Sequence, residues 1–310
     1  MAESLSSPAD LRRGAVSAFL GYLLWGLLPL YWKQLHAIAS LELIAHRLVW
    51  SVVFLALVLV IRDGRTTWWR VWREPRTSAW CCLSGALLTA NWLIFVWAVN
   101  AGFVIECSLG YFLVPLFNAG LGRIFYGETL RPAQGVALAL AAAGVAVLVA
   151  QVGHVPWIAL GLAATFSIYG LLRKRSSLGP MTGLATETLL MAPLALGWLI
   201  WLAASGGSVF AQSDALLTLG AVSTGMVTAV PLLLFAYGAR RLRLTTLGLF
   251  QYVAPTCQFL LGWLVYHEPF SSERAIAFAL IWSGLSVYSA DAWRAGSRAR
   301  QQRPRPVSPG

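Results

Sequence analysis

The sequence predicts an all-α integral membrane protein whose ten transmembrane helices form two inverted five-helix repeats. Three observations lead to this fold class: long apolar segments, basic residues placed between them, and a correspondence between the two halves. Hydrophobic residues make up 58% of the 310 positions, charged residues make up 11%, and the mean hydropathy is +0.69. A soluble domain carries charge on about a quarter of its residues, so this composition excludes an ordinary soluble protein.

The apolar segments are long enough to cross a bilayer as helices, which takes about 20 residues for a hydrocarbon core of about 30 Å. They are too long and too uniformly apolar for the strands of a transmembrane β-barrel, which alternate in polarity. The sixth segment is the weakest, because it is short and runs directly into the basic residues 173–175. The predicted helices lie at 14–34, 41–61, 79–99, 104–125, 132–151, 155–172, 181–203, 215–238, 244–266 and 273–292.

These segments divide the chain into four parts. Residues 1–13 are expected to form a cytoplasmic N-terminus, and residues 14–151 and 152–293 are expected to form the two repeats. Residues 294–310 are rich in Arg, Gln and Pro without an apolar period, which predicts a disordered cytoplasmic tail. The first apolar stretch is too long for the core of a signal peptide, so we expect it to be retained as a helix.

The basic residues orient the predicted helices. Almost all of the 23 Lys and Arg residues fall on the inner side when the N-terminus is placed inside. Lys33 and Arg274 lie on the predicted outer side, and Arg47 lies within a span. Because Lys and Arg concentrate in cytoplasmic loops, we expect a multi-pass membrane protein with both termini in the cytoplasm. The net charge of +11 then reflects membrane orientation, and nucleic acid is not an expected partner.

The two halves correspond under a shift of 140 residues, without gaps from about Asn91 to Gly144. Each half contains an odd number of predicted helices, so the second half must enter the membrane from the opposite face. Inverted repeats are typical of alternating-access carriers, with the substrate site near the midplane between the halves. The identities under this shift are Phe95 with Phe235, Pro115 with Pro255, Leu121 and Gly122 with Leu261 and Gly262, Tyr126 with Tyr266, Glu128 with Glu268, and Gly144 with Gly284.

Several segments are distinctive: 42–51 (ELIAHRLVWS), 91–100 (NWLIFVWAVN), 106–112 (ECSLGYF), 241–252 (RLRLTTLGLFQY) and the region around Glu187. They resemble the RarD family, within the EamA branch of the drug/metabolite transporter superfamily. The resemblance covers nearly the whole chain. It implies a bacterial inner-membrane permease with ten helices and two EamA repeats, related to exporters of amino acids, metabolites or drugs.

Two ionisable side chains lie well inside predicted spans, where each costs about 3 kcal/mol on insertion scales and so calls for a partner or a role. Arg47 lies about six residues into the second span from the outer side, and Glu187 lies equally deep in the seventh from the inner side. The 140-residue shift superimposes them. They are either gating or substrate-contact residues on either side of a central site, or structural residues held by local polar partners.

His46 and Glu106 are the other ionisable candidates. His46 follows Glu42 by one helical turn, so the pair either relays protons near the outer mouth or forms a hydrogen bond at a helix end. Glu106 opens the fourth span, where the helix dipole favours a carboxylate. We expect Arg47 and Glu106 to form an outer gate or to bind a zwitterion. Glu128 and Glu268 are expected to accept free backbone N–H groups at helix starts.

Aromatic and amide side chains complete the candidates for a central cavity. Pro115 and Pro255 are expected to kink their helices at symmetric positions, as hinges or as part of a cavity wall. Packing against lipid or a neighbouring helix is an equal alternative for each aromatic residue. The expected cavity-lining residues are Trp25, Tyr31, Trp92, Tyr111, Phe112, Gln251 and Tyr252.

These features favour a secondary transporter, and specifically an exporter, that moves a small metabolite, amino acid or drug-like molecule by alternating access. The alternative is a membrane-embedded enzyme or sensor, but the acids of the longest loops, Asp63 and Glu74, have no catalytic spacing. The expected partners are a small-molecule substrate and the lipid bilayer, and a monomer is compatible with the sequence. No cofactor or metal is expected, because the four cysteines lack metal-ligand spacing. The substrate, the direction of transport and proton coupling stay open.

Overall fold

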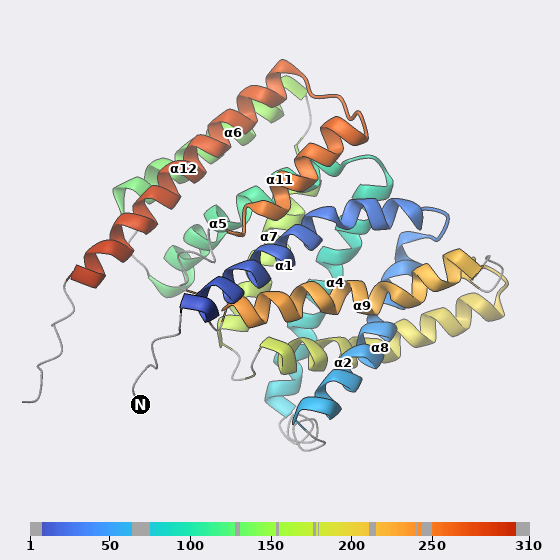
Figure 1. Ribbon diagram of the computed structural model, residues 1–310. Helices are drawn as coiled ribbons and strands as arrows, with labels where there is room; N and C mark the ends of the chain where they lie inside the picture. The colour runs from blue at the N-terminus through green and yellow to red at the C-terminus, as the bar shows by residue number, and fades with distance from the viewer. Residues whose placement is uncertain are drawn as a thin grey trace, which may run out of the picture.

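The computed structural model describes residues 8–63, 75–127, 131–152, 155–175, 178, 180–210, 215–239, 241–242 and 250–301, and these parts of the chain are helical apart from short connections (Figure 1). Within them, six helices are long and apolar enough to cross a membrane, and three apolar helices are shorter. The protein is therefore an all-α, multi-pass membrane protein. The helices are α1 (Pro8–Gln34), α2 (Ser40–Asp63), α4 (Pro75–Asn100), α5 (Val104–Tyr126), α6 (Pro132–Val152), α7 (Trp157–Arg175), α8 (Pro180–Ala204), α9 (Ala215–Ala239), α11 (Val253–Leu260), the π-helical η2 (Leu261–Val265) and α12 (Ser272–Gln301).

The segment predicted as one continuous helix at 244–266 is interrupted in its described part. Residues 251–252 form a turn, α11 begins at Val253, and the chain continues as η2. Pro255 was expected to kink a helix at its middle, but it lies in the first turn of α11. At that position the missing N–H of proline costs no helical hydrogen bond. Pro115 does lie inside its helix, α5.

The last helix is longer than expected. We placed a disordered tail at 294–310, whereas α12 continues to Gln301. Alanine and arginine are good helix formers and recur in this stretch, which extends the helix beyond its apolar part. The rest of the predicted tail lies outside the described residues.

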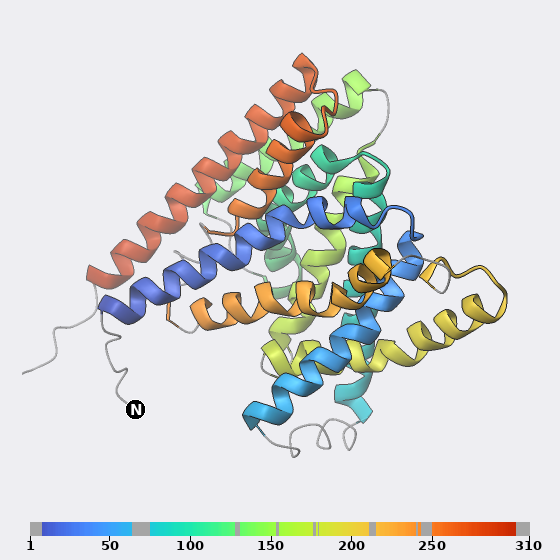
Figure 2. The same cartoon turned by 45° about the vertical axis from the view of Figure 1, so that its right-hand side comes forward.

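Among the described residues, the helix contacts keep the same pattern when α1, α2, α4, α5 and α6 are exchanged, in that order, for α7, α8, α9, α11 and α12. α1 packs against α9 and α11, and its counterpart α7 packs against α4 and α5. α2 packs against α9, and its counterpart α8 packs against α4. The pairs α2 with α8, α5 with α11, and α6 with α12 map onto themselves. Figures 1 and 2 show α6 and α12 side by side along their lengths.

The α6–α12 contact depends on glycine. A Cβ atom on Gly144 would lie 2.8 Å from the carbonyl oxygen of Ala277, and one on Gly284 would lie 2.8 Å from that of Ala137. Both alanines are fully buried. Gly144 with Ala277 and Gly284 with Ala137 are related by the 140-residue shift. Small residues thus bring the two backbones together at equivalent points of the two halves.

Glu268 connects the second half of the chain to the first. Its carboxylate accepts the backbone N–H groups of Val104 at 2.6 Å and Ile105 at 2.8 Å. Burial raises the pKa of the Glu268 carboxyl above its ordinary value, and the two donors oppose this shift. The expectation that Glu268 serves a helix start is correct in kind, but the helix is α5 and not the following α12. Glu128 lies outside the described residues.

Replacing Gly144 or Gly284 with Ala is expected to lower the free energy of unfolding by about 1–3 kcal/mol, because the added methyl group meets a backbone carbonyl. SDS-induced unfolding of the purified protein in mixed micelles, followed by tryptophan fluorescence, measures this change. Gly135→Ala on α6 is the matched control, since a Cβ there meets open space. Equal unfolding curves for Gly144→Ala and Gly135→Ala would contradict the close contact.

Candidate functional site

Among the buried charged side chains of the described residues, Arg47 and Glu187 lie well inside the predicted spans. Arg47 on α2 is 3% exposed, and Glu187 on α8 is 1% exposed. Water cannot solvate either charge, so the surrounding side chains must stabilise it. The two residues have different surroundings, which are described in turn.

The Arg47 guanidinium lies against two tryptophan rings. Its central carbon is 3.8 Å from the ring centroid of Trp92 on α4 and 5.3 Å from that of Trp32 on α1. The hydroxyl groups of Tyr31 and Tyr111 lie within electrostatic reach of the guanidinium. Among the described residues no carboxylate forms an ion pair with Arg47, and its Nε atom has no hydrogen-bond partner. We call these five residues the Arg47 box.

The tyrosines of the Arg47 box are fixed by hydrogen bonds to other helices. The Tyr31 hydroxyl donates to the carbonyl oxygen of Gly220 at 2.5 Å and lies 3.0 Å from Oγ of Ser223, both on α9. The Tyr111 hydroxyl donates to Oδ1 of Asn91 at 3.2 Å. The Asn91 amide donates in turn to two oxygens on α7. The box is therefore held by helices from both halves of the chain.

Glu187, in contrast, is neutralised within the protein. Its Oε1 accepts a 2.6 Å hydrogen bond from the Ser84 hydroxyl on α4, and its Oε2 accepts one of 3.1 Å from Tyr169 on α7. Arg173, one turn further along α7, places Nη1 3.5 Å from Oε1. A Cβ atom on Gly183 would overlap the Arg173 guanidinium, so glycine makes room for this ion pair.

The two charges occupy different levels of the bundle. Ser84, which bonds Glu187, and Trp92, which contacts Arg47, both lie on α4 and are eight residues apart. This spacing corresponds to about 12 Å along a helix axis. Arg47 and Glu187 therefore form two separate centres joined by α4, and they do not contact each other directly.

Of the two roles expected for His46 and Glu42, the hydrogen bond between them is not formed among the described residues, and the proton relay stays a prediction. The Glu42 carboxylate accepts the Ser208 hydroxyl at 2.6 Å and the backbone N–H groups of Phe210 at 3.2 Å and Val209 at 3.4 Å. The His46 ring packs on Phe210 with centroids 4.3 Å apart. Its Nε2 is buried without a partner among the described residues. Glu42 thus binds residues 208–210, ahead of α9, through one hydroxyl and two backbone N–H donors.

Glu106 lies in the first turn of α5, as expected. The expected ion pair with Arg47 is not formed, since within the described chain the ion pairs are Arg131 with Asp291 and Arg173 with Glu187. The reason is that the Arg47 guanidinium points at Trp92 and not at the start of α5.

The remaining aromatic candidates pack between helices. Phe112 contacts Trp282 and Phe278 of α12 edge to face, and Tyr252 stacks on it with centroids 6.5 Å apart. Phe112, Phe278 and Tyr252 belong to a hydrophobic cluster that α5, α6, α7, α11 and α12 form, and not to the cluster that contains Trp32 and Trp92. Gln251 lies half-buried in the turn before α11.

Trp25 packs edge to face on Tyr22 and is tilted against Phe235. The Trp25 carbonyl oxygen accepts the side-chain amide of Gln258 at 3.5 Å. Pro29, four residues further on, has no N–H to occupy that oxygen. Trp25 therefore takes part in the α1–α11 contact.

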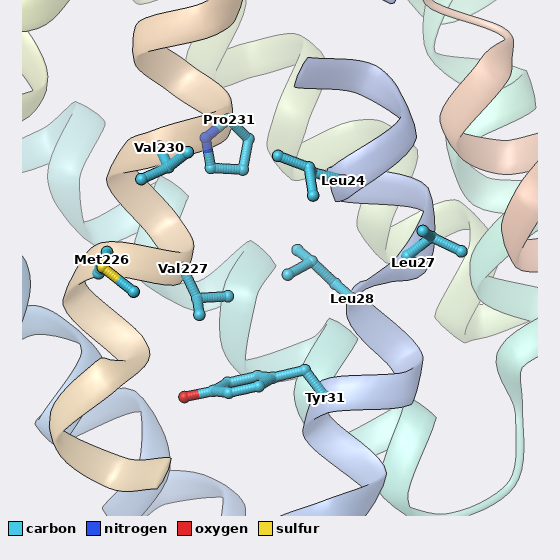
Figure 3. Close-up of a pocket in the computed structure, with 8 residues that line it drawn as sticks. All are labelled: Leu24, Leu27, Leu28, Tyr31, Met226, Val227, Val230 and Pro231. Carbon is cyan, nitrogen blue, oxygen red and sulfur yellow. The ribbon is translucent and has the colours of Figure 1, made fainter. Parts of the chain in front are cut away.

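An apolar cavity of about 290 Å³ lies between α1 and α9 (Figure 3). Tyr31 reaches from α1 toward α9 at one end of it, and among the predicted lining residues it is the one found here. The cavity adjoins the Arg47 box through this residue. Its lining residues are Leu24, Leu27, Leu28, Tyr31, Met226, Val227, Val230 and Pro231.

Sequence reasoning missed four residues of the two centres: Trp32, Ser84, Tyr169 and Arg173. Arg173 was assigned to a cytoplasmic basic cluster, although it follows Tyr169 by four residues and so shares its helix face. That spacing was an available signal. Ser84 and Trp32 carry no comparable signal, because single serines and tryptophans are common in apolar helices.

Comparison with known proteins gives consistent results. Residues 12–150 match the EamA-like transporter family. The chain is 46% identical to an uncharacterized transporter of Vibrio cholerae, with 95% of this chain and 97% of the relative covered. It is 42% identical to Protein RarD of Streptomyces exfoliatus (94% and 92% covered) and 39% identical to Protein RarD of Escherichia coli K12 (91% and 95% covered). One crystal structure aligns with a TM-score of 0.58 at 23% identity over 91% of this chain and 98% of the other, which shows the fold alone.

Glu187→Gln is expected to lower the free energy of unfolding by about 3 kcal/mol, because it leaves Arg173 without its buried counter-charge. Adding Arg173→Gln is expected to recover part of this loss. A double-mutant cycle on SDS-induced unfolding measures the coupling. The half-exposed pair Arg131–Asp291 is the control and should couple by less than about 1 kcal/mol. Equal coupling in the two pairs would show that burial contributes nothing to the Glu187 centre.

Proposed function

Because this chain belongs to the RarD-type branch of the EamA-like transporter family, we propose that it exports a small molecule across the inner membrane by alternating access. The substrate is a small metabolite, an amino acid or a drug-like molecule, and transport is driven by gradients. The observation that carries the proposal is the pair of buried charged centres, one in each half, joined by α4.

The inverted repeat gives this mechanism its geometry. Ten spanning elements in two halves are supported by the packing pattern that survives exchange of α1, α2, α4, α5 and α6 for α7, α8, α9, α11 and α12. The paired contacts of Gly144 and Gly284 support the same relation. Two halves of opposite orientation rock about a shared site, opening it to one side of the membrane at a time.

The Glu187 centre is suited to close the inner side. Arg173 and Tyr169 on α7 hold Glu187 on α8, and Ser84 joins the same carboxylate to α4. Opening toward the cytoplasm separates α7 from α8 and so breaks this network. Arg47 lies on the other side of the midplane, where the substrate enters or leaves the outward-open state.

An enzyme would gather its polar side chains at one membrane surface, where a water-soluble reactant arrives. Here the Arg47 and Glu187 centres lie at two levels separated by about 12 Å along α4. Their spread along the membrane normal favours a path across the bilayer over a reaction site at its surface.

The test combines a deletion strain with a reconstituted system. Metabolite profiling should show at least one small molecule retained by the deletion strain, and proteoliposomes loaded with a cell extract should release the same molecule. Glu187→Gln should slow this release at least roughly tenfold, because the inner closure is lost. Arg131→Gln, at the exposed α6–α12 pair, should leave it unchanged. Export would be ruled out if both strains retained the same metabolites and the loaded proteoliposomes released none of them.

A further inference from the structure

We infer that the Arg47 box is a binding site for the carboxylate of a small aromatic monoanion, which is the substrate class of this transporter. The inference rests on the proposed transport function but is carried by separate observations. These are the absence of a counter-charge for Arg47 among the described residues, the hydrogen-bond donors that have no partner there, and the aromatic walls of the box.

The first observation is energetic. A buried guanidinium loses the hydrogen bonds and the counter-ions that it has in water, and a cation–π contact supplies neither an acceptor nor an opposite charge. Trp92 and Trp32 therefore do not compensate for the burial of Arg47. In the second half, the equivalent position Glu187 has Arg173 as its partner. The first half lacks such a partner among the described residues, and a bound anion would supply it.

The second observation concerns buried polar atoms, on Arg47 and near it, that have no hydrogen-bond partner among the described residues. Nε of Arg47 and Nε1 of Trp32 are both buried N–H donors without partners in the described part of the chain. One turn further along the same face of α2, Nε1 of Trp50 and Oγ of Ser51 are also buried and unpartnered. Three of these four groups donate only, so the ligand they fit is rich in acceptors.

The charge and shape of the Arg47 box narrow the chemical class of the ligand. One guanidinium balances one negative charge, so a monoanion leaves no net charge in the apolar bundle. The planar guanidinium fork matches the two oxygens of a carboxylate. The box is otherwise built from indole and phenol rings, with Phe95 packed edge to face on Tyr111 at 5.7 Å. Such walls stack on an aryl body at little cost in ordering.

Binding to the purified full-length protein in detergent tests this inference directly. The probes are benzoate, phenylacetate and indole-3-acetate, each compared with its neutral amide by isothermal titration calorimetry. At least one carboxylate should bind, and its amide should bind roughly 30-fold more weakly, because it lacks the charge-assisted hydrogen bonds. Binding of an amide as tightly as its acid, or binding of none of the three acids at millimolar concentration, would overturn the inference.

Variants locate the site. Arg47→Gln should weaken carboxylate binding roughly 30-fold, and Arg47→Lys, which keeps the charge but loses the fork, roughly tenfold. Arg47→Lys also serves if Arg47→Gln does not give a monodisperse protein on size exclusion. Trp32→Phe removes one donor while keeping a ring and should weaken binding less. Arg131→Gln should bind like the wild type, and unchanged binding by both Arg47 variants would overturn the assignment.

Flux separates this inference from the proposed function. Carboxylate binding that depends on Arg47, without flux of any molecule through proteoliposomes, would uphold the anion site and contradict transport. Flux of a neutral or cationic molecule that is unaffected by Arg47→Lys would uphold transport and overturn the anion site.

Discussion

Placing charge inside an apolar helix bundle is the constraint on which the interior of this protein depends. The Glu187 carboxylate is stabilised by hydrogen bonds from Ser84 and Tyr169 and by an ion pair with Arg173, on two neighbouring helices. Gly183 leaves room for this network, because a Cβ atom there would displace the Arg173 guanidinium from its position. Several residues that look unrelated in the sequence are thus tied to one carboxylate, and the positions of α4, α7 and α8 follow from it.

Carboxylates near the ends of the helices perform a second task, which is to join the two halves. Glu42 of α2 binds the turn before α9, and Glu268, after η2, binds the start of α5. Each carboxylate accepts two backbone N–H groups of the other half of the chain. These contacts fix the connections at the membrane surface, while the interior contacts of α1 with α9 and α4 with α7 form the walls between the halves.

The helices α6 and α12 provide a third kind of contact, in which close backbone approach replaces polar bonds. Their alanine- and glycine-rich faces lie together along their lengths (Figures 1 and 2). This pair makes few contacts with the helices that carry Arg47 and Glu187. In the mechanism that we propose, the α6–α12 pair is the fixed element, and the charged centres rearrange without disturbing it.

The all-α membrane class and most helix positions could be predicted from the sequence, because hydropathy and helix length are local properties. Arg47 and Glu187 could be singled out too, because an ionisable residue is unusual in an apolar span, and both side chains are buried. Their partners were not readable: Arg173 turned inward, Glu42 bound a distant turn, and Arg47 met tryptophans instead of Glu106. Which side chains meet depends on helix rotation and depth, and those are set by packing among helices far apart in the chain.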